Sequence, residues 1–101
     1  MTLTAMSRRG VPIRLTDERW LHIVEEHSEL AGLLESVLEA VESAEWVYAG
    51  SAGELLAAKA VAAGKYLVVV YRETDAGDGF VITAFLTRRL EYLARRTLLW
   101  P

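Results

Sequence analysis

The stretch YLVVVYRE at residues 66–73 constrains the fold more than any other part of the sequence. Valine and tyrosine favour extended structure, and the run lacks the polar alternation of a strand with one wet face. Because an unbroken apolar strand is usually buried on both faces, we expect this one at the centre of a sheet. A second long strand, at 80–89, follows the turn cluster TDAGDG, so the two strands predict an antiparallel pair.

The N-terminal half predicts two helices in succession. Thr16 is a suitable N-cap for the first helix, because the acidic residues Asp17 and Glu18 follow it and favour a helix N-terminus. Apolar residues then recur at helical spacing until Gly32 interrupts them. They resume on one face of a second helix at 33–42, whose other face is acidic.

Short strands at 46–48 and 54–61 complete an order in which helices precede strands. This order is typical of an α+β domain, with two N-terminal helices packed on one face of an antiparallel meander sheet of four or slightly more strands. A length of 101 residues suits a single domain, which we assign to residues 13–101. We expect a flexible N-terminal tail at 1–12 and a short C-terminal helix or tail.

Composition and charge narrow the class of protein. The absence of cysteine excludes a disulfide scaffold and thiol catalysis. No apolar run approaches the about 20 residues of a membrane span, and the N-terminus lacks the apolar stretch of a signal peptide. We therefore expect a cytoplasmic protein without a membrane partner. Residues 1–50 carry four basic and nine acidic residues, and residues 51–101 carry seven and five, so a bound anion is expected against the later half.

His22 and His27 lie in the stretch WLHIVEEHSE, which at first sight suggests a zinc hydrolase. The zinc motif H-E-x-x-H needs histidines four residues apart on one helix face, and here they are five apart. At about 100° per residue the two side chains would point roughly 140° apart, so we expect neither a metal nor another cofactor. His22 is expected on the surface. His27 lies beside the apolar face, where it is either a packing residue or a proton-transfer residue.

Metal-free cleavage of RNA is the chemistry that the remaining residues allow. It needs a base for the 2′-OH, an acid for the leaving oxygen, and cations or hydroxyl donors around the phosphorane. Proton transfer could fall to His27 or Glu54, and the charge to Lys59, Lys65, Arg72 and Arg88. Each candidate also has a purely structural interpretation, such as an edge lysine or a turn glutamate.

Four stretches resemble a known family: ERWLHIVEEHSE (18–29), ELLAAK (54–59), KYLVVVYRE (65–73) and GFVITAFLTRR (79–89). Their order and motifs are similar to those of the phage-associated nucleases of the barnase–EndoU–colicin–RelE (BECR) fold superfamily. Toxins of the BrnT and RelE types belong to the same wider group. The resemblance implies a small α+β fold, metal-independent ribonuclease activity and, in many cases, a toxin that a neighbouring antitoxin protein neutralises.

The resemblance also implies roles for individual residues. His27 matches the histidine that ends the first helix, and Thr87 with Arg88 matches the polar pair that closes the last strand. Lys59 and Lys65 match basic residues of the middle strands, and Glu54 is a weaker match. We therefore expect His27, Lys59, Arg72, Thr87 and Glu54 to be catalytic and Lys65, Arg88 and Arg89 to bind RNA.

Two classes of function stay open. The first is a metal-independent ribonuclease of toxin type, and the second is a non-catalytic module of the same fold that binds RNA, a protein partner or a second copy of itself as a homodimer. Convergence of His27, Lys59, Arg72 and Thr87 in one cleft would support the nuclease. Placement on unrelated surfaces would favour the binding module, which the apolar segment at 97–101 and an uncovered sheet face would also suit.

Overall fold

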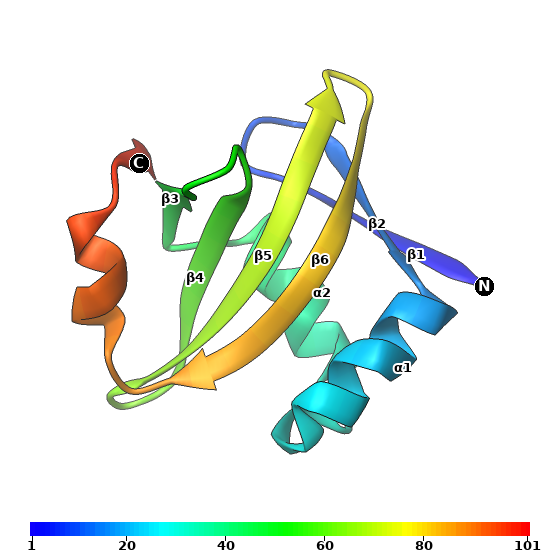
Figure 1. Ribbon diagram of the computed structural model, residues 1–101, viewed down its shortest axis with the longest axis horizontal. Coiled ribbons are helices and arrows are strands. Elements are labelled where there is room, and N and C mark those ends of the chain that lie inside the picture. Colours follow the sequence, from blue (N-terminus) through cyan, green and yellow to red (C-terminus); the bar gives the residue numbers. More distant parts are fainter.

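The computed structural model describes all 101 residues and contains one seven-stranded sheet (Figure 1). The strands are β1 (Thr2–Met6), β2 (Pro12–Thr16), β3 (Trp46–Ala49), β4 (Leu55–Ala62), β5 (Lys65–Asp75), β6 (Asp78–Thr87) and β7 (Leu98–Trp100). They lie in the order β1-β2-β6-β5-β4-β3-β7, and only the β2–β6 pair is parallel. The α+β class is therefore confirmed, whereas the sheet is larger than a four-stranded meander and is mixed.

The helices lie on both sides of this sheet. The two α-helices are α1 (Asp17–Glu26) and α2 (Leu34–Glu42), and the short 3₁₀ helices are η1 (Ser28–Leu30) and η2 (Leu90–Arg95). Figure 1 shows α2 behind the sheet, α1 beside β6, and η2 against the β3–β4 end. Neither α-helix is long and apolar enough to cross a membrane. The predicted N-cap of α1 is confirmed, since Thr16 Oγ1 accepts the Arg19 N–H at 3.1 Å.

Helix placement differs from the prediction. β6 pairs with β2 only at Gly79 and Phe80, so the rest of this side of β6 has no strand neighbour. Helix α1 lies along that open side, where the Arg19 guanidinium donates to the carbonyl of Ile82 at 3.4 Å. Only α2 crosses the middle of the sheet. A helix beside an edge of the sheet and a helix across its face both bury one apolar face, so the sequence pattern cannot distinguish the two placements.

The first twelve residues are not the predicted flexible tail. Residues 2–6 form β1, which pairs antiparallel with β2 from Thr2↔Thr16 to Met6↔Pro12. Buried Ala5 contributes to the core, and Ser7 Oγ donates a hydrogen bond of 2.7 Å to Glu73 on β5. The hairpin is hard to recognise in the sequence because its first strand, TLTAM, is short and buries a single alanine side chain.

The predicted burial of the central strand on both faces is confirmed. Leu67 and Val69 of β5 lie on the face covered by α2, which we call the inner face, and Val68 lies on the opposite, outer face. All three side chains are fully buried. Leu93 of η2 packs on the outer face, so this 3₁₀ helix closes the second core cluster.

The C-terminal segment adds an edge strand to the sheet. The prediction of a short helix or tail agrees with η2, but the following residues form β7, which pairs antiparallel with β3. Leu98 and Leu99 remain substantially exposed on this edge. The segment 97–101 is therefore part of the sheet rather than a loose apolar tail.

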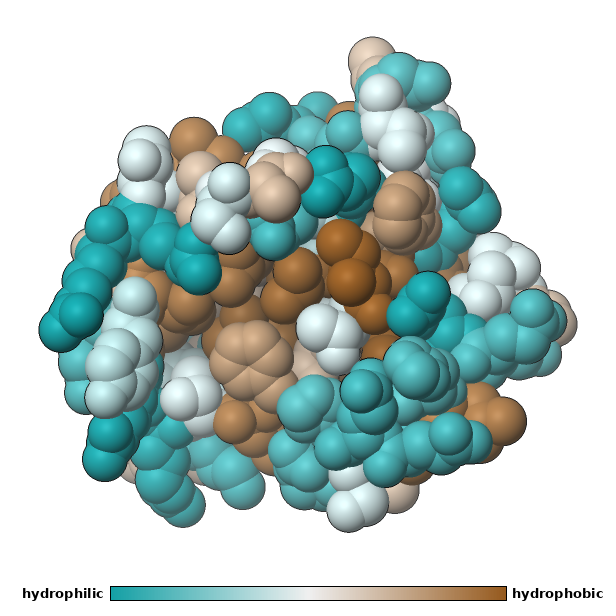
Figure 2. Space-filling model, viewed as in Figure 1, coloured by the Kyte–Doolittle hydropathy of each residue, from teal (hydrophilic) through white to brown (hydrophobic).

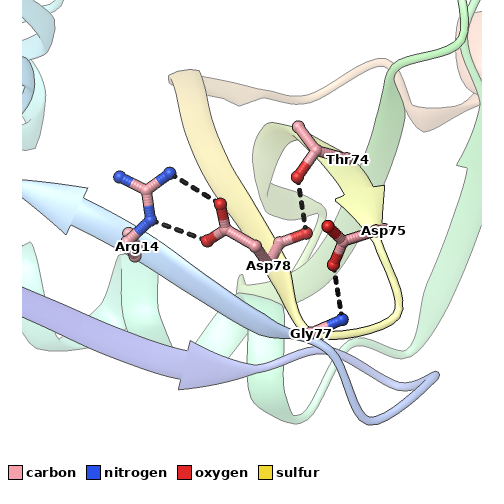
Figure 3. Close-up of polar contacts among 5 residues, drawn as sticks. All are labelled: Arg14, Thr74, Asp75, Gly77 and Asp78. Atoms are coloured by element: carbon pink, nitrogen blue, oxygen red, sulfur yellow. Dashed lines mark hydrogen bonds and ion pairs between the residues drawn. The ribbon is translucent and has the colours of Figure 1, made fainter.

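The β5–β6 turn is tied to β2 by an ion pair (Figure 3). Arg14 Nε and Nη2 donate to Asp78 Oδ1 and Oδ2 at 2.8 and 3.0 Å. These hydrogen bonds lower the pKa of the Asp78 carboxyl. Within the turn, Asp75 Oδ1 accepts the Gly77 N–H at 2.7 Å, and Thr74 Oγ1 donates to the Asp78 carbonyl at 3.1 Å.

Gly79 allows β2 and β5 to approach β6 from both sides. It pairs with Ile13 on β2 and with Glu73 on β5. A Cβ at this position would lie 2.5 Å from the Arg72 carbonyl oxygen and 2.6 Å from Ile13 Cδ1. Such contacts are too close for any carbon atom, so a side chain here would push the parallel β2–β6 pair apart.

Gly79→Ala should lower the free energy of unfolding by about 1–3 kcal/mol, the usual cost of an overpacked core position. The nearby Gly77→Ala is a matched control, because its Cβ would meet only Asp75 Oδ1 at 3.6 Å and its φ is not positive. Urea unfolding of the two variants and the wild type measures both effects. Equal stability of the two variants would contradict this account of the β2–β6 contact.

Candidate functional site

The structure divides the predicted site residues among three places. One end of the β5–β6 pair holds most of them: His27, Lys65, Thr87, Arg88 and Arg89. Glu54 and Arg72 lie at the opposite end of β5. Lys59 lies on the inner face of the sheet. The structure therefore does not bring His27, Lys59, Arg72 and Thr87 into one cleft.

An open pocket of about 260 Å³ lies where β6 ends and β5 begins. It is lined by Glu29, Lys65, Leu86, Thr87 and Arg88. The two cations of the pocket, Lys65 and Arg88, form no ion pair with any carboxylate. We call this the Lys65 pocket, and its free positive charges make it suited to a phosphate-bearing ligand.

Thr87 presents its hydroxyl to this pocket with a hydrogen still to donate. Its Oγ1 accepts the backbone N–H of Arg89 at 3.0 Å. That bond uses a lone pair of the oxygen, so the hydroxyl hydrogen can bond to a ligand. Tyr66 stands directly opposite Thr87 in the strand register, on the outer face.

His27 is connected to the Lys65 pocket through Glu29. His27 forms the C-cap of α1, and its backbone N–H donates to the Ile23 carbonyl at 2.7 Å. Its side chain, one-third exposed, places Nδ1 3.7 Å from Glu29 Oε2. Its ring packs against Phe85 of β6, with ring centroids 6.4 Å apart. His27 is thus both a partly buried packing residue and the histidine nearest the pocket.

His22 has a different environment, as the sequence predicts. Its Nε2 lies 3.0 Å from Glu26 Oε1, on the exposed surface of α1. The two histidines therefore pair with different glutamates. No three His, Asp or Glu side chains in the structure lie close enough together to hold a metal ion.

Lys59 does not line the pocket and instead contacts helix α2. It pairs in register with Leu67, whose side chain is buried on the inner face. Its Nζ lies 3.9 Å from Glu39 Oε1 of α2 and donates to the Ser43 carbonyl at 3.4 Å. These contacts give Lys59 a structural role between β4 and α2.

Arg72 shares the outer face with Thr87. It lies on β5, six residues beyond Tyr66, which is the residue that pairs with Thr87. At about 3.3 Å per residue this separation is roughly 20 Å. Arg72 Nη2 donates to the Ala52 carbonyl at 3.0 Å, in the loop between β3 and β4. Tyr71 points to the inner face instead, where burial raises its pKa to about 12.

Glu54 holds the same β3–β4 loop. Its Oε1 accepts the Ala52 N–H at 2.8 Å, and a Cβ on Gly50 would overlap the Glu54 carboxylate. Hydrogen bonds from the backbone of Ala52 and Glu54, followed by the charges of Arg72 and Arg96, lower the pKa of the Glu54 carboxyl. A carboxylate with a lowered pKa is a weaker base, so this environment does not favour Glu54 as the acceptor of a 2′-OH proton.

Sequence reasoning missed two residues of this region, Glu29 and Tyr66. Glu29 follows the first helix in an acidic stretch and carries no motif of its own. Tyr66 opens the apolar strand YLVVVYRE, whose pattern indicates packing, yet the register places it opposite Thr87. The helical spacing of His27 and the strand alternation of Thr87 give no sign that these elements meet.

Glu54→Gln should change how stability depends on pH. Because the folded pKa lies below the ordinary value of 4.5, the ionised carboxylate stabilises the fold above that value, and this contribution is lost as pH falls through the folded pKa. The stability advantage of the wild type over the variant should therefore be larger at about pH 7 than at about pH 3. Urea unfolding at both values tests this, and an equal difference at both would contradict the assigned role of Glu54.

The Lys65 pocket thus combines two unpaired cations, a free hydroxyl donor and a neighbouring histidine–glutamate pair. Such a set can bind a phosphodiester and move a proton beside it. Comparisons of the chain with protein-family models, with curated proteins and with solved structures find no match.

Proposed function

We propose that this chain is a metal-independent ribonuclease, which cleaves RNA by attack of a 2′-OH on the adjacent phosphate. The observation that carries the proposal is the His27–Glu29 pair beside a pocket with two unpaired cations. This chemistry needs proton transfer and charge stabilisation, and both kinds of group are present within that one region.

His27 is the proposed base for the 2′-OH proton. A carboxylate near Nδ1 favours the tautomer with the proton on Nδ1, which leaves the lone pair of Nε2 free to accept. The Nδ1–Oε2 distance of 3.7 Å is longer than a hydrogen bond, and such contacts commonly tighten when a substrate binds. Glu29 is thus a positioning residue for His27.

The pocket side chains would stabilise the charge that develops on the phosphate. Lys65 and Arg88 supply positive charge, and Thr87 supplies a neutral donor. Of the two cations only the lysine ammonium gives up a proton readily, so Lys65 is the proposed acid for the leaving 5′ oxygen. The products would be a 2′,3′-cyclic phosphate and a 5′-hydroxyl.

The proposed site is smaller than the set predicted from the sequence. It keeps His27, Lys65, Thr87 and Arg88, and it places Arg89 beside them as an RNA contact. Lys59, Arg72 and Glu54 have structural partners elsewhere, so the proposal assigns them no part in the reaction.

A toxin role with a protein antitoxin, in the cytoplasm, is the biological part of the proposal. It rests on the resemblance to BECR nucleases and on the outer face of the sheet, which is apolar and open next to the pocket. Figure 2 shows this face as a hollow of hydrophobic side chains with a hydrophilic rim. The partly buried apolar residues there are Trp46, Val70, Phe85 and Leu90. An antitoxin that covered this hollow would also block the pocket.

A non-catalytic RNA-binding module is the second candidate. The distance of Arg72 and Lys59 from the His27 end favours it, because fewer groups are left to stabilise the phosphorane. The two candidates share the pocket as a phosphate-binding site and differ only in whether His27 moves a proton.

His27→Ala should lower kcat for RNA cleavage by about 10²–10⁴-fold, the usual contribution of a general base. His22→Ala is the matched control, since His22 lies on the exposed face of α1 and pairs with Glu26. Cleavage of labelled RNA in EDTA by the wild type and both variants gives the comparison, after urea unfolding has shown that both variants are folded.

Equal activity of His27→Ala and the wild type would refute His27 as the base. The same variants apply in growing bacteria, where expression of the wild type should slow growth and His27→Ala should relieve it. Normal growth together with an absence of cleavage by the folded wild type would favour the binding module.

Lys65→Ala should lower kcat/KM for RNA by about 10²-fold or more, because the pocket loses one of its two cations together with the proposed acid. Lys59→Ala removes the same charge at a position outside the pocket and should leave kcat/KM within about two-fold of the wild type, since Lys59 contacts only Glu39 and the Ser43 carbonyl. Steady-state kinetics on one RNA substrate measures both variants. A larger loss for Lys59→Ala than for Lys65→Ala would contradict the assignment of the site to the Lys65 pocket.

A further inference from the structure

The segment around η2 is the most basic part of the surface. Four arginines occur within it, at positions 88, 89, 95 and 96, with Glu91 as the only acid. None of the four arginines forms an ion pair. Every other arginine binds a carboxylate or a backbone carbonyl. The unsatisfied positive charge of an overall acidic chain is thus concentrated around η2 and the neighbouring Lys65 pocket.

Tyr92 lies at the centre of these arginines with more than half of its side chain exposed. The guanidinium carbons of Arg89 and Arg95 lie 5.7 and 5.8 Å from its ring centroid, and Arg89 Nη1 donates to its hydroxyl at 2.8 Å. Leu93, by contrast, is buried on the outer face of the sheet and anchors η2. The core therefore does not require an aromatic residue at position 92, and the structure holds its ring outward beside two cations.

This surface is continuous with the Lys65 pocket. Arg88 lines the pocket, and the next residue, Arg89, bonds through its backbone N–H to Thr87. Figure 1 shows η2 leaving the end of β6 and rising along the β3–β4 side of the sheet. In Figure 2 hydrophilic side chains gather on that side of the apolar hollow. An RNA strand bound at the pocket can therefore continue over η2.

We propose that the η2 surface, formed by Arg88, Arg89, Tyr92, Arg95 and Arg96, binds single-stranded RNA that flanks the cleaved bond. The arginines hold the backbone phosphates, and one unpaired base stacks on the ring of Tyr92. Exposed aromatic rings beside cations are the usual platform for single-stranded nucleic acid, because every base offers a flat face. A duplex hides these faces, so it cannot use the ring.

The inference rests on the proposed function for the identity of the ligand as RNA, but its test does not depend on cleavage. The probe is a fluorescent 2′-O-methyl RNA strand of about ten nucleotides, in which the attacking hydroxyl is blocked. Fluorescence anisotropy gives its Kd for the full chain and each variant. A duplex of the same sequence serves as the second probe, and poly-glutamate serves as a competitor that carries charge without bases.

Tyr92→Ala should weaken binding of the single strand by about five-fold or more, the effect of one lost stacking contact. Tyr92→Phe keeps the ring and should bind within about two-fold of the wild type. Leu21→Ala removes another well-exposed apolar side chain, from α1, and should also leave Kd within about two-fold of wild type. The duplex should bind more weakly than the single strand and should not respond to Tyr92→Ala.

Arg95→Gln should reduce the slope of log Kd against log salt concentration by about 0.7, the value for one phosphate contact with a single strand. Arg14→Gln makes the same charge change at the far side of the sheet, where Arg14 pairs with Asp78, and should leave the slope unchanged. A Kd that is the same for Tyr92→Ala and wild type would overturn the proposal. If poly-glutamate displaced the fluorescent strand as efficiently as unlabelled RNA strand does, the proposal would also be overturned. That result would favour an acidic protein partner.

Failure of the nuclease proposal would look different. In that case the wild type would cleave no RNA while its binding of the blocked strand still depended on Tyr92, which would support the η2 surface on a non-catalytic module. Normal cleavage with Tyr92-independent binding would retain the nuclease and remove the η2 surface from it.

Discussion

The burial of β5 on both faces is the constraint on which the rest of the structure depends. Leu67 and Val69 on the inner face and Val68 on the outer face are all fully buried. Each such side chain contributes about 1.5–3 kcal/mol through removal of apolar surface from water. Helix α2 covers one side and η2 part of the other, so β5 can expose polar side chains only near its ends. Lys65 at one end and Arg72 at the other are therefore the cations that β5 can present to a ligand.

The strands and the first helix cap follow from local patterns in the sequence. The shift from helical to strand periodicity predicts β3 to β6, and Thr16 predicts the start of α1. The position of β2 depends on its parallel pairing with β6, whose partners are more than sixty residues apart. No local pattern carries that information. The strand nature of residues 2–6 is not evident for a different reason, since this short strand buries a single alanine side chain.

The candidate site could be predicted only in part, because strand register decides which face a residue occupies. Arg72 and Lys59 are both on long strands, but the β4–β5 register places Lys59 opposite Leu67 and hence on the inner face. An irregularity at Ile82 changes the alternation along β6, so that Val81 joins the core while Thr83 and Thr87 face outward. His27 and Thr87, whose meeting no pattern predicts, are brought to the same end of the sheet by the packing of α1 along the open side of β6.

The basic residues of this chain fall into two groups, those paired with carboxylates and those without a carboxylate partner. Arg14, Arg9 and Lys59 pair with carboxylates on neighbouring elements and help to hold the sheet together. The cations at the Lys65 pocket and along η2 have no such partners. A protein with a net charge of −3 thus keeps one basic region, and this region coincides with the end of the sheet that carries His27.

The chemical nature of the RNA ends after cleavage is the most direct test of the central claim, that the His27 end of the sheet cleaves RNA without a metal. Purified protein would be incubated with a defined RNA in EDTA and the fragments weighed by mass spectrometry. The mechanism predicts 2′,3′-cyclic phosphate and 5′-hydroxyl ends, and no cleavage where a 2′-deoxynucleotide replaces the attacking one. Intact RNA, or fragments with 5′-phosphate and 3′-hydroxyl ends, would contradict it.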